Sequence, residues 1–249
     1  MNYNSINRFT NRADYYNKYR PTYPIVVADF IISEFKLSSD SIIADIGCGT
    51  GIFSSLFKDK IKTIYGIEPN TEMLKFAKKN LSKQNNFIPI NATYEKTTLK
   101  NSSVNAIVCA QAFHWFNINK AKKEFTRITD SNNFCALIWN IRNTKNPFFA
   151  EYENNLCSNI KNYSKRAHNK NYDKMSKNLF ETYKKEIFDN YIDYDFDSIC
   201  GLLKSSSYVP LKAKSYNKIF EEIQIIFNKY CVNNIIKLHF KTHVYSGIL

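Results

Sequence analysis

Apolar residues follow two alternating patterns along the first 140 positions: short continuous runs, and stretches at helical spacing. The continuous, β-branched runs predict five strands, at 41–46, 62–68, 86–90, 104–110 and 134–139. The stretches at helical spacing predict helices at 24–37, 52–58, 70–79 and 118–128. Strands that alternate with helices are typical of a parallel, doubly wound α/β sheet. The third strand contains Pro89, which cannot donate to a ladder, so we expect this strand at an edge.

The pattern changes after residue 140. Residues 141–185 are aromatic and basic, with ten Lys or Arg against four Asp or Glu, and we interpret them as a lid-like helical insertion over the carboxyl edge of the sheet. An amphipathic helix near 217–230 and a long strand at 235–245 follow. We expect one domain over 1–249, with a cap (1–40), a cofactor-binding core (41–140), the insertion, and C-terminal strands and helices (186–249) that complete the sheet.

A glycine-rich loop directly follows the first predicted strand. It carries Gly47, Gly49 and Gly51, with Asp45 two residues before the first glycine. The spacing differs from the G-x-G-x-x-G of dinucleotide sites, and no lysine follows in the position that a triphosphate-binding loop requires. A carboxylate at the strand end would repel a pyrophosphate and attract an ammonium or sulfonium group. The loop therefore favours a cationic ligand.

A second acid ends the next strand. Glu68 lies 17 residues beyond Gly51, where its side chain can accept hydrogen bonds from both hydroxyls of a ribose. An adenosine that carries a cationic amino-acid tail and no phosphates meets all these conditions, which predicts S-adenosylmethionine as the cofactor. A tight glycine turn without a ligand is the alternative, and it explains the glycines but not the two acids.

Several longer motifs carry a resemblance to a known family. They are Arg8 to Tyr16, Tyr19 to Pro24, Asp45 to Gly51, Gly66 to Asn70, Ala92 to Thr97, Gln111 to Phe116, Trp139 to Arg142 and Ser205 to Pro210. With them the chain resembles the class I S-adenosylmethionine-dependent methyltransferases, and within these the methyltransferase type 11 group around the trans-aconitate methyltransferases. The resemblance implies a Rossmann-like, seven-stranded, mostly parallel sheet with helices on both faces and a helical lid after the fifth strand.

The resemblance also implies which residues hold the cofactor. The expected contacts are the loop (Asp45, Gly47, Cys48, Gly49, Gly51), the second strand end (Glu68, Pro69), the adenine region (Thr93, Tyr94, Glu95), the fourth strand end (Ala110, Gln111) and the N-terminal segment, which closes over the cofactor (Tyr16, Arg20). Arg20 is suited to bind a carboxylate of either the cofactor or the substrate. The alternative for Arg20 is a surface arginine before Pro21.

Methyl transfer from a sulfonium needs alignment more than catalytic side chains. His114 is a candidate general base, or a group that orients the acceptor oxygen. Its alternative is a histidine that shapes the pocket floor between Phe113 and Trp115. Arg142 is a candidate for binding a substrate carboxylate, and a surface arginine is again the alternative. Trp115 and Trp139 either wall the acceptor pocket or belong to the core.

Two positions depart from the family's usual pattern. Asn105 stands where these enzymes usually carry Asp, which predicts a weaker local hydrogen bond. Residues 130–133 (Asp-Ser-Asn-Asn) replace a glycine-bearing turn before the fifth strand. Asn tolerates a left-handed backbone, so we expect the turn to form.

Composition limits the alternatives. The net charge of +13 permits an RNA or DNA methyltransferase, but the lysines are spread along the chain and the fourth strand lacks the Asn/Asp-Pro-Pro-aromatic motif of base-amino enzymes. We therefore expect a small-molecule acceptor, a carboxylate on the resemblance alone, and no nucleic acid. A cofactor-binding protein without catalysis is the third alternative.

The other ionisable residues indicate no further site. The six cysteines are scattered, and His239 and His243 lie in a strand-like run without a carboxylate or thiol to complete a site, so we expect no metal. No apolar run of eighteen residues occurs, and the chain start lacks a signal layout, so we expect no membrane insertion and a cytoplasmic protein. The sequence leaves the oligomeric state open.

Overall fold

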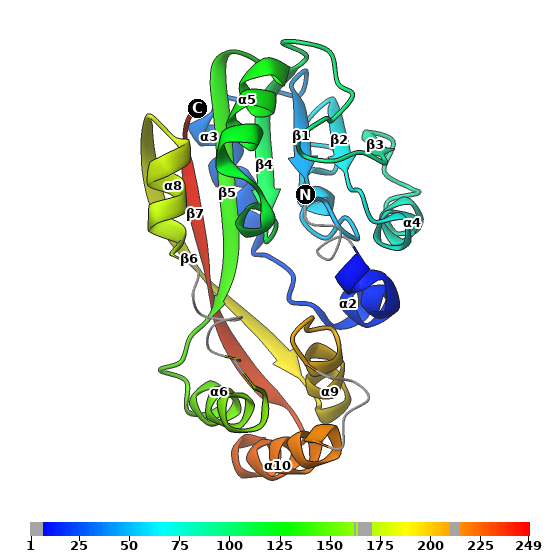
Figure 1. Ribbon diagram of the computed structural model, residues 1–249, viewed down its shortest axis with the longest axis vertical. Coiled ribbons are helices and arrows are strands. Elements are labelled where there is room, and N and C mark those ends of the chain that lie inside the picture. Colours follow the sequence, from blue (N-terminus) through cyan, green and yellow to red (C-terminus); the bar gives the residue numbers. More distant parts are fainter. Residues whose placement is uncertain (1–6, 162, 164–170, 210–214) are drawn as a thin grey trace.

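The structure is a computed structural model that describes residues 7–161, 163, 171–209 and 215–249. The described residues form a seven-stranded sheet in the order β3-β2-β1-β4-β5-β7-β6 (Figure 1). The strands are β1 (Ile42–Ile46), β2 (Thr63–Ile67), β3 (Phe87–Ile90), β4 (Val104–Ala110), β5 (Thr129–Arg142), β6 (Thr182–Tyr194) and β7 (Ile236–Ile248).

Strands β1 to β5 are parallel, and β7 runs antiparallel between β5 and β6. The five strands predicted from the apolar runs are confirmed, and β3 with Pro89 is an edge strand as expected. The chain order reverses between β1 and β4, which lie side by side. In such a sheet ligands bind beyond the carboxyl ends of the strands at this reversal.

Helices cover both faces of the sheet. On one face α3 (Ile25–Glu34) packs Val27 and Ile31 against a cluster that includes Ile43 of β1. On the other face α5 (Ile118–Ile128) packs Phe125 against a cluster that includes the next residue, Ala44. Alternate residues of a strand point to opposite faces, so β1 is buried on both sides. Residues 52–58, predicted as a helix, contain only the short 3-10 turn η2 (Ser54–Phe57).

A separate hydrophobic cluster lies beyond the carboxyl ends of the parallel strands. Figure 1 shows α6 (Pro147–Asn159), α9 (Phe196–Lys204) and α10 (Ser215–Tyr230) gathered around the far ends of β6 and β7. Their apolar side chains form one cluster, to which α10 contributes Ile219, Ile223 and Phe227 at helical spacing. The predicted amphipathic helix near 217–230 is therefore confirmed.

The predicted boundaries of the lid-like insertion, 141–185, are wrong at both ends. Strand β5 continues to Arg142, and β6 already begins at Thr182. Of the helices between them, α6 joins the separate cluster, whereas α8 (Tyr172–Leu179) packs Leu179 into the cluster that α5 covers. Residues 162 and 164–170 of the insertion lie outside the described residues.

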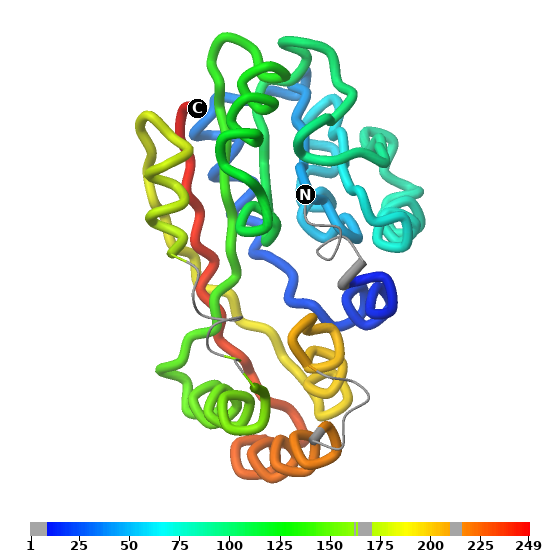
Figure 2. The backbone as a smooth tube through the Cα atoms, viewed as in Figure 1, coloured from blue at the N-terminus to red at the C-terminus, as the bar shows by residue number. Residues whose placement is uncertain are grey.

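The N-terminal segment connects these parts. It forms η1 (Asn7–Arg12) and α2 (Ala13–Tyr19), which Figure 2 shows between the sheet's carboxyl edge and the separate cluster. Arg12 donates to the carbonyls of Lys204 and Ser206 after α9, at 2.8 and 2.6 Å. On the other side, Asn70 donates to the hydroxyl of Thr10 at 3.0 Å. The segment thus ties the region after α9 to the loop before α4 (Thr71–Asn80).

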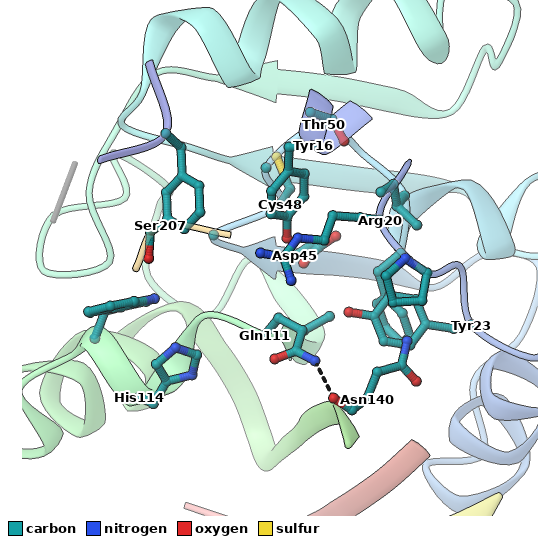
Figure 3. A pocket seen from close by; sticks show the side chains of 18 of the residues that line it. Tyr16, Arg20, Tyr23, Asp45, Cys48, Thr50, Gln111, His114, Asn140 and Ser207 are labelled. Carbon is teal, nitrogen blue, oxygen red and sulfur yellow. Dashed lines mark hydrogen bonds between the residues drawn. The ribbon is translucent and has the colours of Figure 1, made fainter. Parts of the chain in front are cut away.

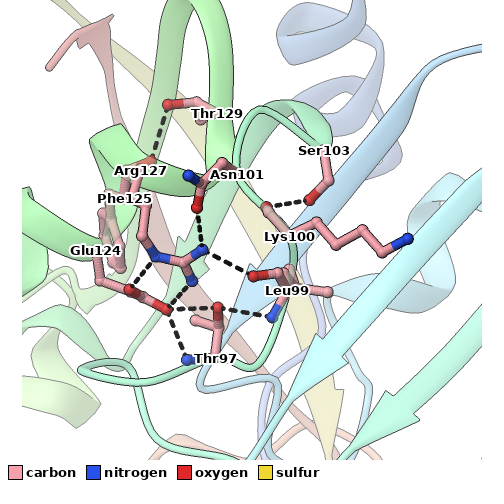
Figure 4. A network of polar contacts seen from close by, with 9 residues as sticks. All are labelled: Thr97, Leu99, Lys100, Asn101, Ser103, Glu124, Phe125, Arg127 and Thr129. Atoms are coloured by element: carbon pink, nitrogen blue, oxygen red, sulfur yellow. Dashed lines mark hydrogen bonds and ion pairs between the residues drawn. The ribbon is translucent and has the colours of Figure 1, made fainter.

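A polar network fixes the loop after β3. Glu124 of α5 accepts hydrogen bonds from both the backbone and the hydroxyl of Thr97, each at 2.7 Å, and pairs with Arg127 (Figure 4). Arg127 also donates to the carbonyl of Leu99 at 2.8 Å. These bonds hold the segment that presents Tyr94 to the sheet edge.

The two unusual positions lie in β4 and β5. Asn105 accepts a hydrogen bond from the backbone of Ile42 at 2.8 Å and donates one to Asp130 at 3.0 Å. Residues 130–133, expected to form a turn, instead belong to β5; the pairing of β5 with β4 has a register shift here, and Asn133 has a left-handed backbone with φ of 52°. Within the described residues, no helix is both long and apolar enough to cross a bilayer.

Candidate cofactor and acceptor site

The glycine loop bends back sharply from the end of β1. Gly47 has φ of 77° and Gly49 has φ of 58°, a region that side chains with Cβ rarely adopt. A Cβ on Gly47 would lie 2.5 Å from the Cβ of Ala112, whereas one on Gly49 would lie 3.4 Å from the terminal methyl of Met73. Glycine is therefore required at position 47 for two reasons: the backbone is left-handed, and the loop after β4 approaches too closely for a Cβ atom.

We expect Gly47→Ala to lower the free energy of unfolding by more than about 2 kcal/mol, because it combines a left-handed alanine with a backbone-anchored clash. Gly49→Ala is the matched control. It should lower the free energy of unfolding by only about 1–2 kcal/mol, the effect of a left-handed alanine alone, because the methyl group of Met73 can move aside. Urea unfolding of both variants measures the difference. Equal losses would show that the contact with Ala112 does not constrain the loop.

Glu68, directly after β2, stabilises the glycine loop through hydrogen bonds. Its two carboxylate oxygens accept from the backbone of Gly49 at 3.0 Å and of Asn70 at 2.8 Å. Burial raises the pKa of Glu68 to about 7, although these two hydrogen bonds oppose the shift. The N-cap residue of α4 is Asn70, whose side chain accepts a hydrogen bond from the backbone of Met73.

Asp45 lies fully buried next to the loop. Its Oδ2 accepts from the hydroxyl of Ser54 at 2.6 Å, and its Oδ1 is buried with no hydrogen-bond partner among the described residues. Burial raises the pKa of Asp45 to about 7, with the bond from Ser54 opposing the shift. A buried carboxylate oxygen without a partner is costly, and a cationic donor would remove that cost.

Arg20 reaches the same place from the N-terminal segment. Its Nη2 donates to the carbonyl of Ser205 at 3.1 Å, and the guanidinium lies 5.0 Å from the ring centre of Tyr16. Its Nε is buried with no partner among the described residues. Figure 3 shows the guanidinium directed toward the end of β1, where Asp45 lies. One cavity is therefore lined by a carboxylate oxygen and a guanidinium N–H group that both lack a hydrogen-bond partner among the described residues.

Three cavities adjoin around these residues. The Asp45 cavity, of about 140 Å³, and the smaller Glu68 cavity share Tyr16, Gly47, Gly49 and Gln111 among their lining residues. The Arg142 cavity, of about 460 Å³, shares five residues with the Asp45 cavity: Arg20, Pro21, Gln111, Asn140 and Tyr208. The three cavities together form a site with separate compartments, which has room for a small organic molecule beside the glycine loop.

Most of the predicted site residues line these cavities. The lining residues are Tyr16, Arg20, Asp45, Gly47, Cys48, Gly49, Glu68, Pro69, Tyr94, Ala110, Gln111, His114 and Arg142. Gly51 belongs to the loop but not to a cavity lining, and Thr93 and Glu95 flank Tyr94 without lining a cavity. Trp115 lines two of the cavities, whereas Trp139 is fully buried in the core.

Sequence reasoning missed two lining residues that connect the cavities. Asn140 lies near the carboxyl end of β5, a position that the strand pattern could have indicated. Tyr208 lies in the Ser205 to Pro210 motif, which the sequence singles out without giving it a role. No local pattern indicates that this segment returns to the sheet.

His114 is fixed by the buried Trp139. The indole nitrogen donates to Nδ1 of His114 at 3.2 Å. Because this bond occupies the Nδ1 lone pair, a neutral imidazole carries its proton on Nε2 and acts as a hydrogen-bond donor there. Nδ1 of His114 therefore has no free lone pair with which to accept a proton from a ligand.

Arg142 belongs to a buried network. It pairs with Glu153 at 2.5 Å and donates to the hydroxyls of Tyr163 at 3.3 Å and Tyr208 at 3.0 Å. The two charged side chains are only 15% and 9% exposed. These bonds use three of the five N–H groups of the guanidinium.

Comparisons with known proteins agree with this geometry. Residues 44–137 match the family model described as a methyltransferase domain. A methyltransferase-like protein of Schizosaccharomyces pombe is 35% identical over 140 residues, which cover 56% of this chain and 53% of that protein. CRG1 of Saccharomyces cerevisiae, assigned as an S-adenosylmethionine-dependent methyltransferase, is 32% identical over 49% of this chain and 43% of its own length. The chain therefore spans about half the length of the curated relatives that it matches.

A solved structure supports the fold over nearly the whole chain. A protein of Anaeromyxobacter dehalogenans, assigned as a type II methyltransferase, superposes with a TM-score of 0.67 at 16% identity, covering 92% of this chain and 97% of that one. In residues 44–137 and in its fold, the chain is therefore similar to the class I S-adenosylmethionine-dependent methyltransferases.

Proposed function

We propose that this protein transfers a methyl group from S-adenosylmethionine to a small-molecule acceptor, and that the acceptor atom is a carboxylate oxygen. The observation that carries the proposal is the pair of unsatisfied groups in the Asp45 cavity. Oδ1 of Asp45 and Nε of Arg20 are both buried without partners among the described residues. The two groups have opposite charges and line one cavity.

A zwitterion satisfies both groups at once. The ammonium of an α-amino acid suits Asp45, and its carboxylate suits the guanidinium of Arg20. A pyrophosphate would meet the carboxylate of Asp45 and offer nothing to it. The cavity therefore fits the methionine part of the cofactor, and the two residues would hold it.

The Glu68 cavity fits the adenosine part. Its walls include the apolar side chains of Met73 and Phe116 and the ring of Tyr94. The rings of Tyr94 and Phe116 stack, with their centres 4.0 Å apart. Each oxygen of Glu68 already accepts one backbone hydrogen bond. Because a carboxylate oxygen can accept two, Glu68 keeps capacity for the ribose hydroxyls.

The chain's own residues then need only to bind, orient and exclude water. The bound cofactor supplies the chemistry, a methyl group on a positively charged sulfur. Phe9, Tyr16 and Trp115 line both the Asp45 and Glu68 cavities and supply an apolar cover. His114 lines the Asp45 cavity, with Nδ1 bonded to the indole nitrogen of Trp139.

The lining of the Arg142 cavity supports an anionic acceptor. Arg20 and Arg142 contribute two positive charges, and Glu153 contributes the single acid. Pro21, Leu202 and Phe240 add apolar surface. Such a lining suits a small organic acid, whose carboxylate is already ionised at neutral pH and needs no general base to act as a nucleophile.

The pH dependence of cofactor binding follows from the two acids. Their pKa values of about 7 in the ligand-free protein mean that both carboxylates take up protons as the pH falls through neutrality. We expect the affinity for S-adenosylhomocysteine to fall by about tenfold per pH unit below pH 6 for each acid that must be ionised. Calorimetric titrations at pH 5.5, 6.5 and 8.0 measure this, and an affinity that stays constant over this range would contradict it.

The acceptor class is tested by transfer of a labelled methyl group. Incubation with methyl-labelled cofactor and separate sets of organic acids, alcohols, amines and total RNA should label only the acids. The product should release the label in mild base, as a methyl ester does. Labelling of RNA, or a base-stable product, would contradict the carboxylate proposal while leaving the cofactor assignment to be judged by binding.

A further inference from the structure

Tyr208 stands where the Asp45 cavity and the Arg142 cavity meet. We infer that Tyr208 is a catalytic residue that donates a hydrogen bond to the anionic oxygen of the acceptor, and that Arg142 is a positioning residue that fixes the phenol. The inference rests on the proposed methyl transfer and assigns a role to the Ser205 to Pro210 motif.

Two arginines of the N-terminal segment fix the backbone around Tyr208. Arg12 donates to the carbonyls of Ser206 and Val209, each at 2.6 Å. Arg20 donates to the carbonyl of Ser205 at 3.1 Å. Carbonyls on both sides of Tyr208 are therefore tied to the segment that also lines the cofactor cavities, which places the phenol reproducibly relative to the cofactor.

The side chain is fixed as well. The ring packs edge to face on Tyr163, with ring centres 5.0 Å apart and planes at 81°. Nη2 of Arg142 donates to the phenol oxygen at 3.0 Å. A phenol that accepts a hydrogen bond keeps its own O–H for donation, and a charged donor on the oxygen makes that O–H a stronger donor.

The electrostatic surroundings agree with a strong donor. Burial raises the pKa of Tyr208, but the positive charges of Arg142 and Arg20 outweigh it, so that the pKa lies below the ordinary value. The same two charges favour a negative oxygen beside the phenol. The ligand class is therefore an organic oxyanion with an apolar body, bound with its charged end toward the Asp45 cavity.

The transfer step balances without a proton acceptor. The anionic oxygen forms a bond to the methyl carbon as the carbon–sulfur bond breaks and its electron pair stays on sulfur. No proton moves, so Tyr208 stays protonated throughout. The product oxygen is neutral and accepts a weaker hydrogen bond from Tyr208, which favours release of the product.

The test uses 4-fluorobenzoate as the probe, because it has one carboxylate and an apolar ring. Its binding to protein saturated with S-adenosylhomocysteine is followed by fluorine NMR. We expect Tyr208→Phe to raise the probe's dissociation constant at least tenfold. Tyr152→Phe is the matched control: its ring lies 5.0 Å from the guanidinium of Arg142, but its hydroxyl is buried without a partner among the described residues and lines none of the three cavities.

The positioning role of Arg142 has its own readout. The double variant Arg142→Met, Glu153→Met removes the donor to Tyr208 without leaving a buried charge. Because it also removes one of the two positive charges of the cavity, it should weaken probe binding at least as much as Tyr208→Phe does, and adding Tyr208→Phe to it should cause a smaller further loss than in the wild type. If Arg142 had only a structural role, the losses of probe affinity caused by the double variant and by Tyr208→Phe would add.

The outcomes are distinct. Equal probe binding by wild type and Tyr208→Phe, no probe binding by wild type, or equal binding of the neutral 4-fluorobenzamide would each overturn the role of Tyr208. Failure of the wild type to bind S-adenosylhomocysteine would instead overturn the proposed function. In that case the dependence of probe binding on Tyr208, measured without the nucleoside, still decides whether this anion site exists.

Discussion

Asp45→Asn is expected to abolish measurable binding of S-adenosylhomocysteine at pH 8, a loss of at least about 100-fold, and to make the ligand-free protein more stable. Binding is lost because the amide has no negative charge for the ligand's ammonium, and a buried charged pair contributes several kcal/mol through its hydrogen bonds. The fold is kept because the amide oxygen can accept from the hydroxyl of Ser54, as Oδ2 of Asp45 does.

The gain in stability follows from the pKa of Asp45. Burial raises it from 3.8 to about 7, so the folded protein binds this proton more tightly than the unfolded chain. The contribution of Asp45 to stability therefore falls as the pH rises from about 4 to about 7 and is constant above. Removing the acid should raise the free energy of unfolding by on the order of 2–4 kcal/mol at pH 8, and the gain should shrink toward pH 4.

Urea unfolding at pH 8 and pH 4.5, with calorimetry at pH 8, measures both effects. Asp40→Asn is the control, because Asp40 is an exposed aspartate before the same strand, and it should change neither quantity. A variant that binds the ligand like the wild type, or that is less stable at pH 8, would show that Asp45 is not a strained ligand-binding acid.

The second large effect is expected at the Arg142–Glu153 pair. Arg142→Met and Glu153→Met should each lower the free energy of unfolding by about 3–5 kcal/mol, because each leaves a buried charge without its partner. The double variant should lose less than about 2 kcal/mol, because apolar side chains of similar size replace both charges. Urea unfolding of all three variants measures the coupling.

The exposed pair of Lys60 and Asp29 serves as the control cycle, because these side chains are 30% and 54% exposed. Its coupling should not exceed about 1 kcal/mol. If the losses at Arg142 and Glu153 simply add, the pair is not buried enough to fix Tyr208, and the positioning role loses its basis.

Sequence alone predicted the elements that bury a face. Strands β1 to β5 and helix α5, which begins and ends as predicted at 118 and 128, carry a continuous apolar run or a helical stripe. Strand β6 was not located, because most of its side chains are exposed on both faces and it is held by pairing with β7. An element without a buried face has no hydrophobic periodicity. For this reason the predicted insertion ended at residue 185, inside β6, which begins at Thr182.

In the candidate site, too, some residues could be placed from the sequence and others could not. Asp45 lies near the end of β1 and Glu68 directly follows the adjacent strand β2, so the sequence order of two neighbouring parallel strands predicts that they converge. The backbone before Tyr208 is held at the cavities by hydrogen bonds from Arg12 and Arg20 to the carbonyls of Ser206 and Ser205, more than 180 residues away in the chain. The contact of Trp139 with His114 is also tertiary, and the sequence could not decide between a pocket wall and the core.

We expect Asp45 and Arg20 to receive the amino-acid end of the cofactor. Calorimetric titration at pH 8 with S-adenosylhomocysteine and with 5′-methylthioadenosine tests it most directly, because the second ligand shares the nucleoside and the thioether but lacks the amino acid. We predict micromolar binding of the first and at least about 100-fold weaker binding of the second, as expected for loss of two charge-assisted interactions. Equal affinities, or binding of NAD in their place, would contradict the account.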